Sequence, residues 1–222
     1  MATLTRMNKT VFHYQADPKA IEQDSFRQIR KLTNLSRFSN DEQQVAMRIV
    51  HSTGLPDVAE QVHFSQHACQ AGREALKQRK AILCDVEMVK QGLTKRMLSA
   101  EPLCYLNDVR VPELAKQRGD TRSMAALEFW AEHLAGSIVI IGNAPTALFR
   151  LMEMLENGCP KPALIIGMPV GFVGAAESKQ ALWENYKKLG VECMTLLGRQ
   201  GGSAVASASC NALLRCNAGE LY

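Results

Sequence analysis

Residues 137–167, SIVIIGNAPTALFRLMEMLENGCPKPALIIG, contain the pattern that decides the fold. Two short and fully apolar runs, 137–141 and 163–166, are separated by a turn with Gly and Pro and by a helical segment at 145–156. An apolar run without alternation is typical of a strand that is buried on both faces. A helix between two such strands indicates a parallel sheet.

The same rhythm continues on both sides of this stretch. A strand-like run at 191–197 lies between helical segments at 175–189 and 203–215, and residues 81–86 form an earlier apolar run. Strands that alternate with helices at this spacing predict a mainly parallel sheet with helices on both faces. The expected fold class is therefore a three-layer, Rossmann-like α/β fold.

The first part of the chain is predicted to be helical. Pro18 opens an amphipathic segment, and Ser39 with Glu42 has the spacing of a capping box before an apolar stretch that ends near Gly54. A further cap signal predicts a longer helix over 57–80. No linker or repeat interrupts the chain, so we expect one domain over 1–222, with a mostly helical portion at 1–80 and an α/β portion at 81–222.

Composition fits a soluble globular protein. The 222 residues include 46% hydrophobic and 22% charged residues, and 26 Lys and Arg against 22 Asp and Glu give a net charge of +4. These values exclude a disordered, collagen-like or disulfide-rich chain. The mild positive charge is too weak to indicate nucleic acid as a partner, but it suits a protein that handles anionic small molecules.

The cysteines and the chain start indicate a cytoplasmic protein. The seven Cys are scattered and form no CxxC pair, which is typical of reduced thiols. No apolar run is long enough to span a bilayer, and the N-terminal residues lack the apolar region of a signal peptide. We therefore expect no membrane partner.

Three loops follow predicted strands at one edge of the sheet, at 142–146, 167–174 and 198–203. Each is rich in Gly and leads into a helix, whose free N–H groups favour anions. The loops predict a ligand crevice at this edge. The alternative is that they are only tight turns. None has the GxGxxG or GxxxxGK[ST] spacing, which disfavours a dinucleotide or nucleoside triphosphate.

His51 is the most informative ionisable residue. It falls near the end of the predicted helix that begins after Ser39, where the negative helix end is expected to raise its pKa. Such an imidazole can donate a proton near neutral pH. Arg48 lies three residues earlier on nearly the same helix face. The alternative interpretation is a capping His and a solvated Arg.

Other clusters carry less information. His63 and His67 are four residues apart on the expected helix, but no further ligand completes a metal site, so none is predicted. Thr121-Arg122-Ser123 at a predicted helix start suits a carboxylate, as does Thr94-Lys95-Arg96. Helix capping and a solvated basic patch are the alternatives for these two clusters.

The ordered motifs resemble the precorrin-8X methylmutase family, with its cobalt-precorrin-8 counterparts. The resemblance extends from about Tyr14 to about Leu214. It is carried by AILCDVEMVKQGLTKRM at 81–97, GDTRSMAA at 119–126, IGNAPTALF at 141–149, IGMPVGFVGAAES at 166–178 and GRQGGSA at 198–204.

The resemblance implies an isomerase of cobalamin biosynthesis that moves a methyl group from C-11 to C-12 of a corrin-type macrocycle, giving hydrogenobyrinic acid or its cobalt equivalent. The rearrangement is intramolecular, so the resemblance implies no redox or methyl-donor cofactor, and any cobalt belongs to the substrate. It also implies a homodimer with the active site near the subunit interface, and it suggests channelling to other cobalamin-pathway enzymes.

The resemblance assigns His51 as the general acid. The residues that it places near the macrocycle are Tyr14, Ser25, Arg48, Thr94, Lys95, Arg122, Ser123, Asn143, Thr146, Gly201, Gly202 and Ser203.

Two other functions compete with this hypothesis. A non-catalytic corrinoid-binding or channelling protein of the same fold would use the three loops without turnover. A nucleotide-dependent oxidoreductase on a Rossmann-like sheet would show saturable NAD(P) binding, although the phosphate-binding fingerprint is missing.

Overall fold

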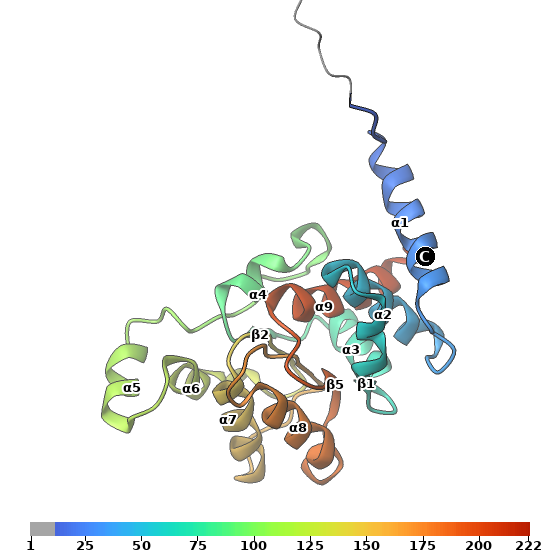
Figure 1. Ribbon diagram of the computed structural model, residues 1–222. Helices are drawn as coiled ribbons and strands as arrows, with labels where there is room; N and C mark the ends of the chain where they lie inside the picture. The colour runs from blue at the N-terminus through green and yellow to red at the C-terminus, as the bar shows by residue number, and fades with distance from the viewer. Residues whose placement is uncertain (1–11) are drawn as a thin grey trace, which may run out of the picture.

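Parallel strands form the centre of the structure, a computed structural model that describes residues 12–222 (Figure 1). The five-stranded sheet has the order β1-β5-β4-β3-β2, and only β1 is antiparallel to its neighbour. This confirms the predicted α/β class with a mainly parallel sheet. The strands are β1 Val62–Phe64, β2 Ile82–Cys84, β3 Ile138–Ile141, β4 Leu164–Gly167 and β5 Glu192–Leu196.

The helices begin and end largely where the sequence signals them. The capping box of Ser39 and Glu42 is present, and Gly54 ends α2 in the left-handed conformation. None of the helices described is long and apolar enough to cross a membrane. The α-helices are α1 Pro18–Leu32, α2 Asn40–Thr53, α3 Ala68–Lys77, α4 Glu87–Gly92, α5 Val111–Arg118, α6 Arg122–Ala126, α7 Pro145–Glu156, α8 Ala175–Leu189 and α9 Ser203–Ala218, and the 3-10 helices are η1 Pro56–Gln61, η2 Lys95–Met97 and η3 Leu127–His133.

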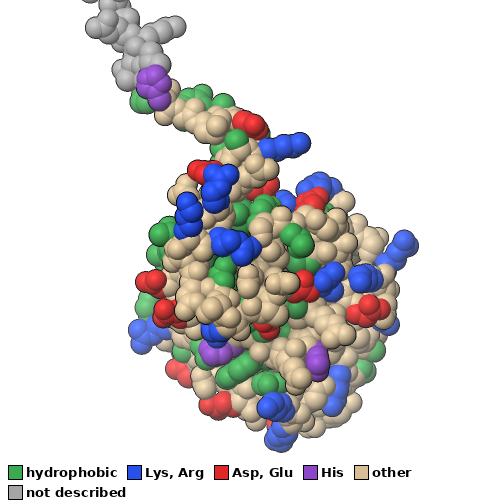
Figure 2. All heavy atoms as spheres, turned by 90° about the vertical axis from the view of Figure 1, so that its right-hand side faces the viewer, with side chains coloured by type: hydrophobic (Ala, Val, Ile, Leu, Met, Phe, Trp, Pro, Cys, Tyr) green, Lys and Arg blue, Asp and Glu red, His purple; other side chains and the backbone are tan. Residues whose placement is uncertain are grey.

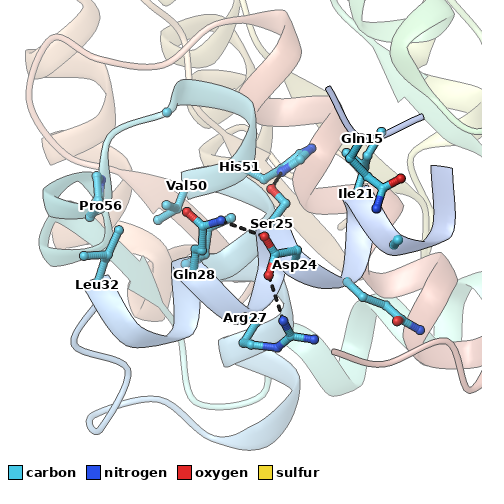
Figure 3. Close-up of a pocket in the computed structure, with 14 residues that line it drawn as sticks. Gln15, Ile21, Asp24, Ser25, Arg27, Gln28, Leu32, Val50, His51 and Pro56 are labelled. Carbon is cyan, nitrogen blue, oxygen red and sulfur yellow. Dashed lines mark hydrogen bonds and ion pairs between the residues drawn. The ribbon is translucent and has the colours of Figure 1, made fainter. Parts of the chain in front are cut away.

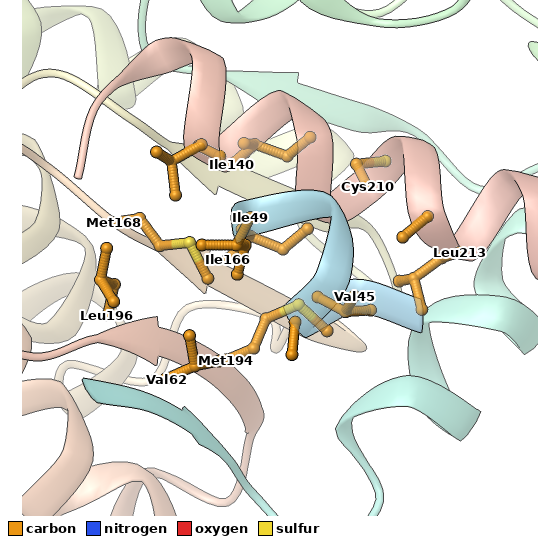
Figure 4. Packing of buried hydrophobic residues seen from close by; sticks show 14 of the residues in the cluster. Val45, Ile49, Val62, Ile140, Ile166, Met168, Met194, Leu196, Cys210 and Leu213 are labelled. Carbon is orange, nitrogen blue, oxygen red and sulfur yellow. The ribbon is translucent and has the colours of Figure 1, made fainter. Parts of the chain in front are cut away.

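Both faces of the sheet are covered by helices. Alternate residues of β3 point to opposite faces, so Ile140 packs with Ile49 of α2 on one side while Val139 packs in the cluster of α7 and α8 on the other. Figure 4 shows Ile140 and Ile49 among the buried side chains of the first face. This explains why the strands carry apolar residues at every position.

The connections determine which helices cover each face. β3, β4 and β5 follow one another across the sheet, so crossovers of one hand place α7 and α8 on the same face. The opposite face is covered by α2 and α3, from the first part of the chain, and by α9, from its last part. The loops after β4 and β5 therefore leave the carboxyl edge toward opposite faces, and such a divergence favours a ligand site there.

The prediction of one helix over 57–80 is wrong. This stretch contains η1, then β1, and only then the shorter α3. β1 pairs along β5, with Val62 opposite Leu196. The partner strand lies far along the chain, so no local pattern around residue 62 reports this pairing, and three residues are too few to show alternation.

Candidate active site

His51 lies in the last turn of α2 and faces α1 (Figure 3). Its Nδ1 atom is 3.1 Å from the hydroxyl oxygen of Ser25, which α1 contributes. The imidazole also stacks on Phe26, with 5.0 Å between ring centroids. The structure thus brings together two of the residues that the sequence assigns to the site, 26 positions apart in the chain.

A groove of about 680 Å³ lies beside this pair, between α1 and α2. Its walls mix apolar side chains such as Ile21 and Leu32 with the amides of Gln15 and Gln28. Figure 3 shows Ser25 and His51 next to each other among the side chains of this groove. A concave surface with a few polar groups around one imidazole is a typical small-molecule site.

The predicted rise in the pKa of His51 is wrong. Burial lowers the pKa of this imidazole below its usual value, the nearby Arg48 lowers it further, and Glu22 only partly opposes them. The helix end is present as predicted, but α1 partly covers the imidazole and the cation of Arg48 lies beside it. In the free protein, His51 is therefore mainly neutral near pH 7.

Arg48 shares the face of α2 with His51, yet its charge is already paired. Its guanidinium lies 2.9 Å from the Glu22 carboxylate and stands over the rings of Phe26 and Tyr222. Only 14% of the Arg48 side chain is exposed. An arginine held in this way fixes α1 against α2.

A second group of the assigned residues meets at the carboxyl edge of the sheet. The hydroxyl oxygens of Thr121 and Thr146 are 2.9 Å apart, which joins the start of α6 to the start of α7. The backbone of Ser203 lies close to Gly142: a Cβ atom added to Gly142 would be 2.9 Å from the Cα atom of Ser203. The three segments 121–123, 142–146 and 201–203 therefore form one edge cluster.

Arg122 belongs to the edge cluster and is exposed. It donates to the Leu106 carbonyl at 2.9 Å and to the Asn107 side-chain oxygen at 3.2 Å. Neither partner is charged, so its positive charge is available to an anion. Two other assigned residues, Ser123 and Asn143, also lie in the edge cluster.

The remaining assigned residues lie outside the edge cluster. Thr94 donates its backbone N–H to the side-chain oxygen of Asn211 in α9 at 2.8 Å, and Lys95 is exposed. Tyr14 precedes α1 and is 81% exposed.

Asp85 is a functional anchor that the sequence reasoning missed. This carboxylate is 2% exposed and accepts the backbone N–H groups of Gly142, Asn143 and Ala144 at 2.9 to 3.0 Å. Burial raises its pKa, while these N–H groups act in the opposite direction. The available signal was an acidic residue directly after a buried strand, where a carboxylate needs several donors.

The loop at 198–203 is also held in place, by close contacts with the loop after β4 and with α8. The N–H of Gly202 donates to the Met168 carbonyl at 2.8 Å, and a Cβ on Gly201 would lie 2.4 Å from that oxygen. Lys179 of α8 is fully buried and donates to the carbonyl of Gln200, and burial lowers its pKa to about 8. The glycines thus allow the loop to contact the loop after β4.

The groove and the edge cluster are neighbouring regions. Pro56, which lines the groove, also lines a small hollow with Gln200 of the third loop. The groove itself is lined by α1, α2 and the turn after α2, and not by the three glycine-rich loops. A ligand that reached from His51 to Arg122 would have to span both regions.

His63 and His67 do not share a helix, which corrects the prediction. His63 lies in β1 against Trp183, with 4.9 Å between ring centroids, and His67 precedes α3. Over residues 12–222, no group of three or more His, Cys, Asp or Glu side chains could hold a metal ion.

The fold and the groove define a class of protein: an α/β enzyme with an ionisable site beside the carboxyl edge of a parallel sheet. A sequence model of the precorrin-8X methylmutase family matches residues 20–216. The chain belongs to this family, and it is an isomerase of cobalamin biosynthesis.

Individual relatives support the same family. The chain is 51% identical to the precorrin-8X methylmutase of Pseudomonas aeruginosa, over 90% of this chain and 96% of that protein. It is 36% identical to the cobalt-precorrin-8 methylmutase of Priestia megaterium, covering 88% and 87% of the two chains. A solved precorrin-8X methylmutase from Thermus thermophilus superposes with a TM-score of 0.82 at 36% identity, covering 92% of this chain and 98% of that one.

Proposed function

We propose that this chain moves a methyl group from C-11 to C-12 of precorrin-8X, with His51 as the proton donor. The observation that supports this most directly is an imidazole on the groove wall, hydrogen-bonded to Ser25 at 3.1 Å. Protonating the conjugated macrocycle makes it electron-poor and favours migration of the methyl group. The rearrangement is intramolecular, so we propose no redox or methyl-donor cofactor.

Ser25 fits the proton transfer in both states of His51. Its hydroxyl oxygen accepts a hydrogen bond from Nδ1–H of the imidazolium, and it still accepts that bond from the neutral ring that has given up its Nε2 proton. The contact therefore persists while the proton leaves from Nε2. Ser25 thereby holds the ring in one orientation as it delivers the proton.

The charges around the site suit a macrocycle fringed with carboxylates. Arg122 is exposed and has only neutral partners, and Lys95 is exposed beside α4. The positive N-terminus of α9 begins at Ser203 in the edge cluster. The carboxylates of a bound substrate would also raise the pKa of His51 and so protonate it where the acid is needed.

The pH dependence of turnover tests this coupling. kcat/KM reports the free enzyme and kcat the enzyme–substrate complex. Because the pKa of free His51 lies below 6.5 and an acid must be protonated, kcat/KM should fall as pH rises through that lower value. kcat should fall only at higher pH. Rate profiles of the wild-type enzyme measure both limbs, and coincident limbs would contradict substrate-induced protonation.

We also propose that two copies form a homodimer through the loop after β4. Phe172 and Val173 are 86% and 89% exposed on this loop, and adjacent large apolar side chains at such exposure are typical of an interaction surface. Sedimentation should give a dimer for wild type and for Val109→Asp, which changes another exposed residue, and a monomer for Phe172→Asp. A dimeric Phe172→Asp protein would exclude this loop as the interface.

The substrate form is decided by a direct comparison. The Pseudomonas protein and a 52% identical Sinorhizobium protein are both named precorrin-8X methylmutases, so we propose the metal-free macrocycle as the substrate. We also propose the cytoplasm as the location, because the seven free cysteines are typical of a reducing compartment. Absorption spectra should show faster conversion of precorrin-8X than of cobalt-precorrin-8. Binding of both without conversion would instead indicate the corrinoid carrier, for which channelling to a later pathway enzyme is the remaining proposal.

A further inference from the structure

The last residue of the sequence lies against the first described helix. Figure 1 shows the C-terminal end beside α1, and the Tyr222 ring stacks on Phe26 with 3.7 Å between centroids at an angle of 11°. Phe26 in turn stacks on His51. The three rings form a continuous stack, with Tyr222 at one end and the proposed proton donor at the other.

The hydroxyl of Tyr222 joins three helices. It donates to Glu22 of α1 and accepts hydrogen bonds from Arg48 of α2 and, at 2.8 Å, from Arg215 of α9. Glu22 also pairs with both arginines, at 2.9 and 3.4 Å. Burial and the bond to Glu22 raise the pKa of Tyr222 to about 12, so the phenol remains a donor throughout the working range of pH.

The backbone of Tyr222 is held as well. The Gln44 side chain donates to its carbonyl and accepts from its N–H, each at 3.0 Å. Gln44 is a buried residue of α2. The same main-chain oxygen also accepts a hydrogen bond from Arg30 of α1, so both helices hold the backbone of Tyr222.

α1 depends on these contacts because it has few others. Its buried residues are Phe26 and Ile29, and the helix extends away from the body of the protein (Figures 1 and 2). Of these two, Phe26 is the residue that Tyr222 covers. α1 also carries Ser25 and one wall of the groove.

We propose that Tyr222 is a positioning residue for the His51–Ser25 pair: its ring and hydroxyl fix α1 against α2, so that Ser25 stays within hydrogen-bond distance of His51. The catalytic part of this role rests on the function proposed above. A small displacement of α1 would separate Ser25 from His51 and open the groove, and misplacement by about 1 Å can cost about 100-fold in rate.

Three variants separate this role from general stability. Tyr222→Leu removes the stack and the hydroxyl, Tyr222→Phe keeps the stack, and Tyr186→Leu removes a partly buried tyrosine from α8 on the other face. In Tyr222→Leu we expect faster hydrogen exchange in α1, a His51 pKa closer to its ordinary value because the ring is less covered, and a kcat/KM reduced by up to about 100-fold. Tyr222→Phe should keep most of the wild-type behaviour in each of these measurements. Tyr186→Leu should behave as wild type in all of them.

The first two measurements are made without substrate, so they test the positioning even if the proposed reaction is wrong. A folded Tyr222→Leu protein with unchanged α1 exchange and unchanged His51 titration by NMR would overturn the proposal. So would equal effects in Tyr186→Leu. If Tyr222→Leu does not fold, Gln44→Leu, which removes only the bonds to the Tyr222 backbone, must shift the His51 titration in the same direction, and an unchanged titration overturns the proposal.

Discussion

Replacing His51 with alanine is expected to abolish detectable turnover of precorrin-8X while corrinoid binding survives. A general acid typically supplies about 10²- to 10⁴-fold in rate, and within residues 12–222 no other imidazole lines the groove. Binding should change little because His51 is one of fourteen lining residues. Absorption spectra measure turnover, and titration with the corrinoid product measures binding.

Two further variants make this result specific. His51→Asn keeps a side chain that can bond to Ser25 but cannot supply the proton, so it should be as inactive as the alanine variant. His67→Ala removes an exposed histidine outside the groove and should retain wild-type rates. Full turnover by His51→Ala would refute His51 as the essential acid.

Replacing Asp85 with alanine is expected to cause the largest loss of stability. The change leaves the N–H groups of Gly142, Asn143 and Ala144 without their acceptor. Each buried unsatisfied donor costs about 1–3 kcal/mol, so the free energy of unfolding should fall by at least about 3 kcal/mol. Urea unfolding measures this loss.

The comparison with Asp85→Asn tests the cause. The asparagine keeps the size of the side chain, but one of its two oxygens becomes an NH₂ group that cannot accept the loop donors. Its loss of stability should therefore be smaller than that of Asp85→Ala and still clear. Glu60→Ala removes an exposed carboxylate and should be nearly neutral. If Asp85→Ala were as stable as wild type, the loop would not depend on this anchor.

The outcome of the turnover assay also separates the competing functions. Conversion of either macrocycle by wild type but not by His51→Ala excludes the carrier. Saturable binding of NAD(P) without conversion would revive the oxidoreductase, against the family membership. Neither result depends on the position of Tyr222.

The sequence by itself predicted the elements that depend on local pattern. The apolar runs gave β2 to β5, because strands buried on both faces need apolar residues at every position. The helices α7 and α8 were predicted at their observed bounds, because Pro145 marks a helix start and Gly190 a helix end. The motif order predicted the family, which the family match confirms, and the resemblance assigned His51 as the proposed proton donor.

Only the tertiary structure decided the features that join distant parts of the chain. β1 is a strand because β5 lies beside it, and the pKa of His51 falls because its ring is partly buried against α1 and lies next to Arg48. The charge of Arg48 is paired with Glu22, and Tyr222 reaches both. The physical reason is the same in each case: hydrophobic period and helix caps are properties of neighbouring residues, whereas desolvation and charge pairing depend on which residues the fold brings together.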